Sequence, residues 1–514
     1  MENGQNTEIC NFGYVVEKNR SLYPDHVAIE DLTKQKTFTW EDLDIRANKV
    51  SSGLKKIGVK KGDRVCAILL NTIEYCDIFL GCQKIGAIFS PLNFRLSLKE
   101  ITYILKHARP KILVFDNVFS ALVDIPHQKT IKFISVGKSD RDDNTLSYDE
   151  LLGQGNGEVA DEYYGKDTLA VMMYTAGTTG HPKAVALTNE NLLFAAIDAN
   201  IQARTDVQDV ILVAPPLFHI GAFSWLFTPA LYMANRLIFP GFFDPTETYK
   251  IIENKQVTMT LLIVTMIKML YNIKDKDSYD ISSLKLMGAG GEPCPEFLKE
   301  YFKGCIAPGY GLTESCGTGA LLPTKNALSK PANCIGKLSP SYDMRLLNNT
   351  TGEVQNTGEG ELLLRGPSIA KGYWNMSEET TERFQNGWFH TGDICKKDED
   401  GFLYWLGRSD EMIKSGGENI FPSEIEQVIQ THPMVESVCV IGVVDEKWGT
   451  VPKAVIVVRK GGEITKDGML NYIKGKIADF KRPRQYEFVE ELPVKPTAKM
   501  PIDREKVKEL YGNQ

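Results

Sequence analysis

The stretch Leu169-Ala-Val-Met-Met-Tyr-Thr-Ala-Gly-Thr-Thr-Gly-His-Pro-Lys183 joins an apolar run to a loop rich in glycine and threonine. The apolar run, residues 169–174, predicts a buried strand. A glycine-rich turn after a strand presents backbone N–H groups to phosphate oxygens, and the threonine hydroxyls and Lys183 add further donors and a positive charge. The spacing G-x-x-G-x-x-K, followed by Ala184, differs from that of the P-loop. The stretch therefore indicates a phosphate-binding loop of a type other than the P-loop. The alternative interpretation is an ordinary surface turn.

Strand and helix patterns alternate on both sides of this stretch, as is typical of parallel α/β layers. Before it, a helix is expected at 40–57, strands at 65–70, 87–93 and 111–115, and a polar loop at 137–160. After it, apolar runs predict strands at 210–214, 236–239, 258–264, 284–287 and 305–307. The apolar segment 210–233 contains helix-breaking prolines, so it predicts a buried strand, loop and helix rather than a membrane span.

The pattern changes after about residue 340. Short strands are expected at 342–347, 360–365 and 402–406, and they predict a small β subdomain. Beyond Asp410 the pattern predicts a separate α+β domain, with helices at 422–431 and 466–477 and strands at 435–444 and 453–459. We therefore expect an N-terminal domain of residues 1–409 and a C-terminal domain of residues 410–514.

Composition excludes several classes of protein. The 514 residues are 43% hydrophobic and 24% charged, with a net charge of −7, which fits a globular protein and argues against a nucleic-acid partner. The ten cysteines form no C-x-x-C pair and the seven histidines no H-x-x-x-H spacing, so a zinc site is not expected. Scattered cysteines and the absence of a recognisable signal peptide favour a cytoplasmic location.

Five further segments carry glycines, hydroxyls or charges. Residues 287–292 and 308–315 are expected as loops after strands, and residues 387–393 place an acid at the end of a glycine turn; the other two segments are 407–419 and 495–500. Each one alone is compatible with an ordinary turn or a solvated surface. Their occurrence together, in this order, is far more specific.

The ordered segments resemble the adenylate-forming superfamily of acyl-CoA synthetases, luciferases and peptide-synthetase adenylation domains. The motifs are most similar to those of fatty-acid and aryl-CoA ligases, and the resemblance extends nearly end to end, including residues 86–96. It implies an α/β fold with a large N-terminal body of two α/β lobes and a small β-barrel-like subdomain. A small mobile α+β C-terminal domain would follow, with its hinge at Asp410.

The resemblance also implies roles for single residues. Lys183, His219 and Lys499 would be catalytic, and Glu314 would help to hold Mg²⁺. Ala176 and Ala184 stand where the family often has serine and glycine, and the loss of the serine hydroxyl would weaken phosphate contacts. The residues expected to bind ATP or AMP are Thr175, Thr178, Thr179, Gly180, Lys183, Gly288, Gly290, Gly309, Tyr310, Gly311, Thr313, Asp393, Arg408 and Lys499.

The region around His219 narrows the class of carboxylic acid that is expected as the substrate. Amino-acid-activating relatives carry an aspartate there, whereas this chain has His219, which is either a neighbour of the acyl carboxylate or a buried structural histidine. No lysine or arginine lies between Phe218 and Asn235, so an apolar fatty or aryl monocarboxylic acid is expected. The expected acyl pocket is His219, Phe223, Leu262, Gly288, Ala289, Gly290 and Gly317.

Coenzyme A is the expected acyl acceptor. The residues that resemble CoA contacts are Ser415, Gly416, Gly417, Trp448, Phe480, Arg482 and Arg484, although an ordinary charged surface remains the alternative for the arginines. The expected function is therefore an ATP-dependent acid–CoA ligase that forms AMP, with ATP, Mg²⁺ and coenzyme A as cofactors and co-substrates. Alternatives are a ligase that loads a carrier protein, a luciferase-like oxygenase and a non-catalytic adenylate-binding regulator. A homodimer is possible.

Overall fold

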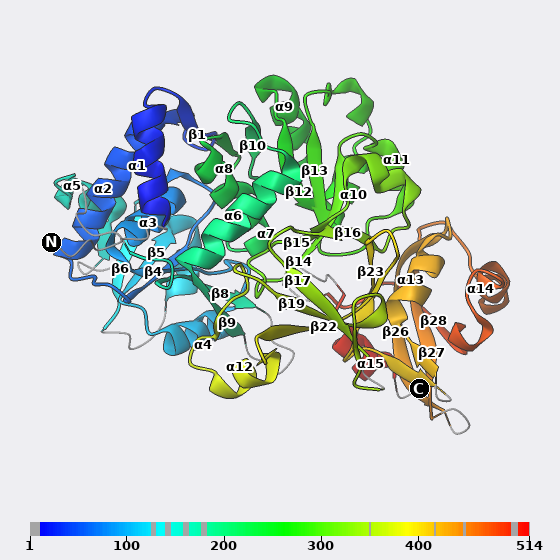
Figure 1. Cartoon of the computed structure of the whole chain (residues 1–514). Coiled ribbons are helices and arrows are strands. Elements are labelled where there is room, and N and C mark those ends of the chain that lie inside the picture. Colours follow the sequence, from blue (N-terminus) through cyan, green and yellow to red (C-terminus); the bar gives the residue numbers. More distant parts are fainter. Residues whose placement is uncertain are drawn as a thin grey trace. The chain divides into compact units, whose positions relative to one another are not determined.

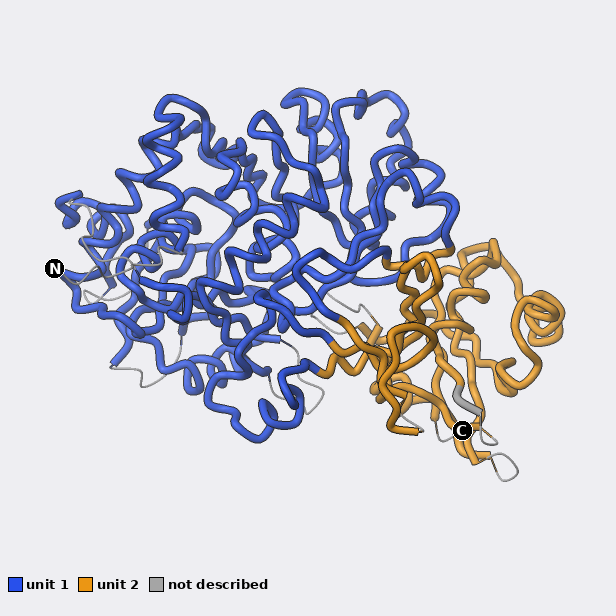
Figure 2. The backbone as a smooth tube through the Cα atoms, in the orientation of Figure 1, with its two compact units in different colours: residues 1–330, 336–343, 364–389 blue, residues 331–335, 344–363, 390–514 orange. Residues whose placement is uncertain are grey.

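The computed structural model describes residues 11–124, 130–138, 145–157, 164–175, 182–348, 351–415, 418–445, 449–494 and 502–512. The chain forms two compact units (Figure 2). The first comprises residues 1–330, 336–343 and 364–389, and the second comprises residues 331–335, 344–363 and 390–514. The first unit is therefore discontinuous in sequence, because residues 364–389 belong to it whereas residues 344–363 belong to the second unit.

One sheet of the first unit has the strand order β20-β9-β8-β4-β3-β5-β6-β7. Of these strands, β4, β5, β6, β8 and β9 are labelled in Figure 1. Its parallel strands are β3 Arg64–Ile68, β4 Ile88–Pro91, β5 Ile112–Asp116, β6 Lys132–Val136, β7 Thr145–Ser147 and β8 Leu169–Thr175. Two antiparallel strands, β9 Lys183–Thr188 and β20 Gly372–Tyr373, complete the edge beside β8. The helices of this region are α1 Phe12–Leu22, α2 Trp40–Lys56, α3 Ile73–Ile85, α4 Leu98–Ala108 and α5 Tyr148–Gln154.

A second set of strands in the first unit has the order β15-β14-β13-β12-β10-β11-β1-β2. These strands are β1 Val27–Asp31, β2 Lys36–Thr39, β10 Val210–Leu212, β11 Arg236–Phe239, β12 Met259–Ile263, β13 Leu286–Gly290, β14 Ile306–Gly311 and β15 Gly319–Leu321. Neighbours from β14 to β1 run parallel. The accompanying helices are α6 Asn189–Ala203, α7 Ile220–Ala222, α8 Thr228–Met233, α9 Pro245–Lys255, α10 Val264–Tyr271 and α11 Glu296–Tyr301, with a π-helical turn at Phe223–Phe227.

Short strands and a compact α+β part make up the second unit. The strands β17 Asp343–Leu347, β18 Val354–Gln355, β19 Gly358–Arg365, β22 Trp388–Lys397 and β23 Leu403–Arg408 lie in the order β18-β17-β19-β22-β23. A three-stranded sheet of β26 Val435–Asp445, β27 Gly449–Val458 and β28 Gln485–Val489 follows, with the hairpin β24 Ile413–Ser415 and β25 Glu418–Ile420. Its helices are α13 Pro422–Gln430, α14 Lys466–Ile473 and α15 Arg504–Tyr511.

The expected α/β fold class is confirmed, and residues 210–233 form the expected strand, loop and helices. Two expectations were wrong. The segment 137–160 is not only a loop: it contains β7 and α5, because Ser147 and Glu150 form a capping box and Tyr148 and Leu151 are buried. The helix expected at 466–477 ends at Ile473, since Lys474 is extended and Gly475 has φ +78°.

Three motifs expected in loops or turns lie on strands. Gly288–Gly290 ends β13, Gly309–Gly311 ends β14, and Asp393 lies within β22. Glycines lack a side chain but still pair through their backbone, as Gly288 does with Leu261 and Gly290 with Ile263. The strand assignment therefore extends further along the glycine runs than their composition suggests.

None of the helices within the described residues is long and apolar enough to cross a membrane.

Candidate active site

Thr175 and Lys183 lie opposite each other where β8 and β9 end and begin. The two strands are antiparallel, and the Thr175 hydroxyl donates to the Lys183 carbonyl oxygen at 3.4 Å. Lys183 is buried, with a residue exposure of 8%. Thr178, Thr179 and Gly180 lie outside the described residues, so their expected contacts with phosphate stay a prediction.

Lys183 and Glu314 both contact Tyr373. The Lys183 ammonium lies 5.4 Å from the centre of the Tyr373 ring. The Tyr373 hydroxyl donates to Glu314 Oε1 at 2.7 Å. The structure thus brings the expected phosphate lysine to the ring, and the expected metal carboxylate to the hydroxyl, of one side chain. Tyr373 was missed from the sequence because it lies in an unremarkable Gly-Tyr-Trp segment.

Three parallel strands end side by side near the expected acyl pocket. Ile263 of β12 pairs with Gly290 of β13, and Ala289 of β13 pairs with Pro308 of β14. A Cβ added to Gly290 would have no atom within 4 Å, so open space lies beside this glycine. Ligands of open α/β sheets bind at the carboxyl ends of such strands. The arrangement suits binding by the glycine-rich ends of β13 and β14.

The turn after β14 is tightly packed. A Cβ on Gly311 would lie 2.1 Å from the Gly317 carbonyl oxygen, so only glycine allows this approach. Gly317 has φ +79°, and its Cβ would lie 2.9 Å from the Ile220 carbonyl oxygen. Ile220 directly follows His219. The turn that carries Thr313, which is 4% exposed, and Glu314 is therefore held against the segment that carries His219.

The segment before His219 is held by two side chains from other elements. Asn71 Nδ2 donates to the carbonyl oxygens of Val213 and Pro215, both at 2.9 Å, and Asn71 Oδ1 accepts from the Leu217 N–H at 3.0 Å. The Tyr75 hydroxyl donates to the Leu217 carbonyl oxygen at 2.9 Å. Asn71 was not predicted from the sequence, because its three partners are distant along the chain.

Two expected pocket residues are fully buried. Phe223 packs edge-to-face on Phe79, with ring centres 5.2 Å apart, and Leu262 is 0% exposed within β12.

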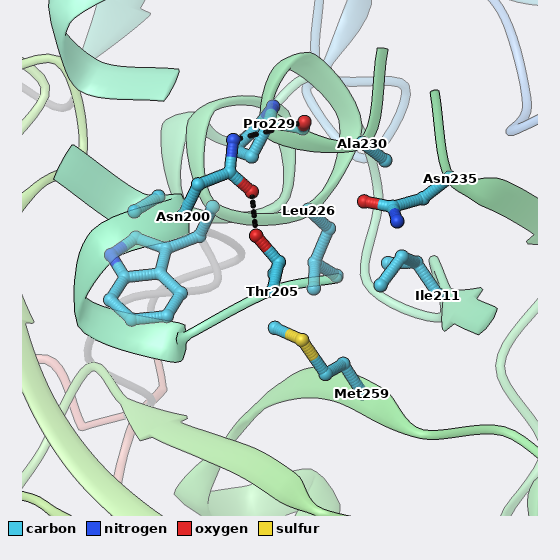
Figure 3. A pocket seen from close by; sticks show the side chains of 10 residues that line it. Asn200, Thr205, Ile211, Leu226, Pro229, Ala230, Asn235 and Met259 are labelled. Carbon is cyan, nitrogen blue, oxygen red and sulfur yellow. Dashed lines mark hydrogen bonds between the residues drawn. The ribbon is translucent and has the colours of Figure 1, made fainter. Parts of the chain in front are cut away.

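A separate small cavity lies where Asn200 bonds to Thr205 and to the Pro229 carbonyl oxygen (Figure 3). Its volume is about 10 Å³. That is about the space of one water molecule, so this cavity does not hold a carboxylic acid. The lining of the acyl pocket stays a prediction.

Asp393 and Arg408 pair within the second unit. They are opposite one another on β22 and β23, and Arg408 Nη1 lies 3.5 Å from Asp393 Oδ1. Trp405 Nε1 donates to the same oxygen at 3.1 Å, and the Asp393 N–H donates to the Thr391 hydroxyl at 3.0 Å. Asp393 is 3% exposed. The structure therefore brings these two expected nucleotide-binding residues together and adds Trp405, which was missed.

Charged pairs surround the expected hinge. Arg408 Nε lies 3.3 Å from Asp410 Oδ1, and Arg504 Nε lies 3.4 Å from Glu411 Oε1. Burial raises the pKa of Glu411 above its ordinary value, and the positive charge of Arg504 opposes that rise. Arg504 also bonds to Glu426 of α13. Glu411 is therefore tied to the α+β part, whereas Asp410 pairs with the last residue of β23.

The expected CoA residues are only partly described. Ser415 is 9% exposed on β24, and Phe480 is 43% exposed. Arg482 pairs with Asp479, and the Arg484 N–H donates to the Pro452 carbonyl oxygen at 2.9 Å. Gly416, Gly417, Trp448 and the expected catalytic residue Lys499 lie outside the described residues. Their roles stay predictions.

The donor set fits a magnesium ion that arrives with phosphate. Within the described parts of the chain, no group of three or more His, Cys, Asp or Glu side chains could hold a metal ion. Mg²⁺ is commonly held by one or two carboxylates together with substrate phosphates and water. The Glu314 carboxylate, with the Lys183 ammonium over the ring of the same Tyr373, is a suitable partner for such an ion.

Comparison with known proteins identifies the family. The AMP-binding enzyme family matches residues 16–374, and the AMP-binding enzyme C-terminal domain matches residues 424–499. The chain belongs to the AMP-binding enzyme family. The adenylate-forming superfamily expected from the motifs is thereby confirmed.

Relatives of this AMP-binding enzyme extend over nearly the whole chain. The long-chain-fatty-acid–CoA ligase FadD13 of Mycobacterium tuberculosis is 31% identical over 496 residues, covering 95% of this chain and 97% of the relative. A feruloyl-CoA synthase of Amycolatopsis is 33% identical over 467 residues, covering 90% and 92%. The structure of the Bacillus subtilis o-succinylbenzoate CoA synthetase with its acyl-adenylate intermediate matches with a TM-score of 0.84 and 28% identity, covering 96% and 97%. The expected reaction class, an acid–CoA ligase, agrees with these names.

Proposed function

We propose that this AMP-binding enzyme is an ATP-dependent acid–CoA ligase. It joins an apolar carboxylic acid to the α-phosphate of ATP, releases pyrophosphate, and then transfers the acyl group to coenzyme A with release of AMP. The observation that carries the proposal is the gathering of Lys183 and Glu314 around Tyr373 in a chain that belongs to this family. The relatives named as fatty-acyl, feruloyl and succinylbenzoate CoA ligases support the same reaction.

The first half-reaction needs charge neutralisation, because a carboxylate attacks a polyanionic triphosphate. Lys183, together with the loop before it, binds the phosphate chain, and Thr313 contacts the α-phosphate. Mg²⁺ held by Glu314 supplies further positive charge at the phosphate oxygens when it is bound. Asp393 accepts hydrogen bonds from the ribose hydroxyls, and Tyr310 stacks on the adenine. Lys499 brings its charge to the α-phosphate and the acid carboxylate.

The acid lies between the His219 segment and the carboxyl ends of β12 and β13. The side chains expected there are apolar or absent, with Leu262 and Ala289 buried and open space beside Gly290. Such a lining suits a fatty or aryl monocarboxylic acid better than a charged one. His219 lies beside the acyl carboxylate in this arrangement.

The second half-reaction requires a different placement of the C-terminal residues. A domain of residues 410–514 rotates about Asp410 relative to residues 1–409, which removes Lys499 and presents Ser415, Gly416 and Gly417 to pantetheine. Trp448, Phe480, Arg482 and Arg484 contact the CoA nucleotide. The ion pair between Arg408 and Asp410 and the pair between Arg504 and Glu411 support a pivot between residues 410 and 411.

The setting of the enzyme is also part of the proposal. A reducing, cytoplasmic compartment is supported by the nine described cysteines, which are all buried and form no disulfide among the described residues. A homodimer stays a prediction, and light scattering of the purified protein at two concentrations tests it.

The proposed function is tested by measuring pyrophosphate release with a panel of short, fatty and aryl acids, with and without CoA. Release that depends on an apolar acid, together with an acyl-CoA product, is expected. AMP release that requires a carrier protein instead of CoA would favour the carrier-loading alternative. ATP binding without any acid-dependent turnover would favour the non-catalytic regulator.

A further inference from the structure

Tyr373 lies between two groups of opposite charge that come from distant parts of the chain. Its hydroxyl donates to Glu314 Oε1 at 2.7 Å, and the Lys183 ammonium lies 5.4 Å from its ring centre. Tyr373 is 8% exposed, so both interactions are formed with little competition from bulk water. A partly buried cation–π contact and a hydrogen bond to a carboxylate are each stronger than their solvent-exposed equivalents.

The backbone around Tyr373 is fixed on several sides. Tyr373 pairs with Val185 of β9, and the Trp374 N–H donates to the Ala184 carbonyl oxygen at 2.8 Å. The Tyr373 N–H donates to the Thr380 hydroxyl at 2.9 Å. Gly372 has φ +142°, and a Cβ there would lie 2.4 Å from Thr380 Cγ2, so this approach requires glycine. The ring is therefore carried by a short strand that has little freedom to move.

The same segment also holds the backbone of Glu314. The Ala370 N–H donates to the Glu314 carbonyl oxygen at 2.8 Å. Residues 370–374 thus hydrogen-bond to the glutamate through both its backbone and its side chain, and to the strand that begins with Lys183. Fixing two charged side chains before the ligand arrives lowers the entropy lost on binding.

We propose that Tyr373 is a positioning residue that sets the Lys183 ammonium and the Glu314 carboxylate for a magnesium-bound triphosphate. This role rests on the proposed function, because it assigns phosphate to Lys183 and magnesium to Glu314. Tyr373 acts through these two residues and does not itself touch the reacting atoms. Its hydroxyl governs the orientation of the carboxylate, and its ring governs the position of the lysine.

The test compares Tyr373→Phe, which removes the hydroxyl only, with Tyr373→Leu, which also removes the ring. Tyr301→Phe is the matched control, because the Tyr301 hydroxyl also donates to a carboxylate, Asp277, at 2.7 Å. Calorimetry measures binding of α,β-methylene-ATP to the full-length protein at several magnesium concentrations. Kinetics measures the magnesium concentration for half-maximal pyrophosphate exchange, the KM for ATP and the KM for the acid.

For Tyr373→Phe we expect the half-maximal magnesium concentration and the dissociation constant of the analogue to rise about tenfold or more, as loss of one hydrogen bond to a charged group predicts. The KM for the acid and the melting temperature should stay as in Tyr301→Phe. Tyr373→Leu should bind the analogue still more weakly. In a Lys183→Met background the difference between the Phe and Leu variants should vanish, since the ring has then lost its cation.

Equal magnesium dependence in the wild type and Tyr373→Phe would overturn the role while leaving the proposed function intact. A lower melting temperature with unchanged magnesium dependence would overturn it as well, because it would show a purely structural contribution. A wild-type protein that binds no ATP analogue would overturn both the proposed function and the role of Tyr373.

Discussion

Asp393 and Arg408 lie opposite each other on β22 and β23, and Arg408 Nη1 is 3.5 Å from Asp393 Oδ1. Arg408 also donates to the Thr391 carbonyl oxygen at 2.8 Å, and Trp405 donates to the same aspartate oxygen as the arginine does. The aspartate is therefore oriented by two neighbours on one strand. A carboxylate held in this way is well suited to accept hydrogen bonds from a ribose.

Asp393→Asn tests that role. Loss of the charge weakens the hydrogen bonds from the ribose hydroxyls, and we expect the KM for ATP to rise roughly 10- to 100-fold, which corresponds to about 1.4–2.7 kcal/mol. The KM for the acid should change little. Asp343→Asn is the control, because Asp343 forms an exposed ion pair with Arg365 at 2.6 Å. A normal KM for ATP in Asp393→Asn would contradict the assignment.

Lys499→Ala should separate the two half-reactions. We expect acid-dependent pyrophosphate exchange to fall by about a thousandfold or more, as for loss of a charge that stabilises a transition state. Thioester formation from supplied acyl-AMP and CoA should continue. Lys508→Ala, an exposed substitution in α15, is the control. Loss of both half-reactions would speak against a role confined to adenylation.

Asn71→Ala should disturb the segment that carries His219. Three hydrogen bonds from a residue that is 3% exposed hold this segment, so we expect kcat/KM for the acid to fall about tenfold or more. The dissociation constant of the ATP analogue should stay unchanged. Asn200→Ala removes a comparably buried asparagine that also bonds to a backbone carbonyl, and it controls for lost stability. Equal effects in both variants would show that the loss is only structural.

Asp77 makes stability depend on pH. Burial raises the pKa of Asp77 from its ordinary value of 3.8 to about 6, although Arg46 and Tyr148 bond to it and oppose that rise. The folded protein then holds this proton more tightly than the unfolded chain does. The unfolding free energy contributed by Asp77 is therefore present below pH 3.8 and is lost as the pH rises to about 6.

Asp77→Asn removes this titration. Urea unfolding at pH 4.5 to 7.5 should show the stability of the variant, relative to the wild type, increasing with pH by up to about 2 kcal/mol. A relative stability that decreases with pH would mean that Arg46 outweighs burial and that the pKa of Asp77 is lowered.

Removal of magnesium should affect one half-reaction only. Excess EDTA should abolish pyrophosphate exchange, since the triphosphate then keeps its full charge beside Glu314. Thioester formation from purified acyl-AMP should persist, because no polyanionic leaving group remains. Restored exchange on adding magnesium is the control for chelator damage, and a thioester step that also stops would contradict the assignment of the metal to the phosphates.

The sequence predicted local features of this enzyme well. The strand that became β8 is an uninterrupted apolar run, and the helix expected at 40–57 is α2, Trp40–Lys56. The charged and glycine-rich motifs around Lys183, Glu314 and Asp393 are also local. Both kinds of signal depend on residues close together in the chain, and they were sufficient to indicate the family.

Features that depend on distant pairing could not be predicted. Tyr373 has its position because β20 pairs with β9, and Asn71 matters because β10 and its following loop reach it in space. Nothing in the flanking residues of either one signals these contacts. For the same reason the glycine motifs after Met287 and Pro308 were expected as loops, although pairing with neighbouring strands extends β13 and β14 through them.

The discontinuity of the first unit has a consequence for how the enzyme matures during synthesis. Strand β9 emerges from the ribosome long before β20, and the chain between them includes residues of the second unit. A nascent chain that ends between residues 315 and 369 contains Lys183 and Glu314 but lacks the segment that joins them. Pairing of such high sequence separation is slow to form. Affinity for magnesium-bound ATP should therefore be acquired late, and it can serve as a reporter of completed folding.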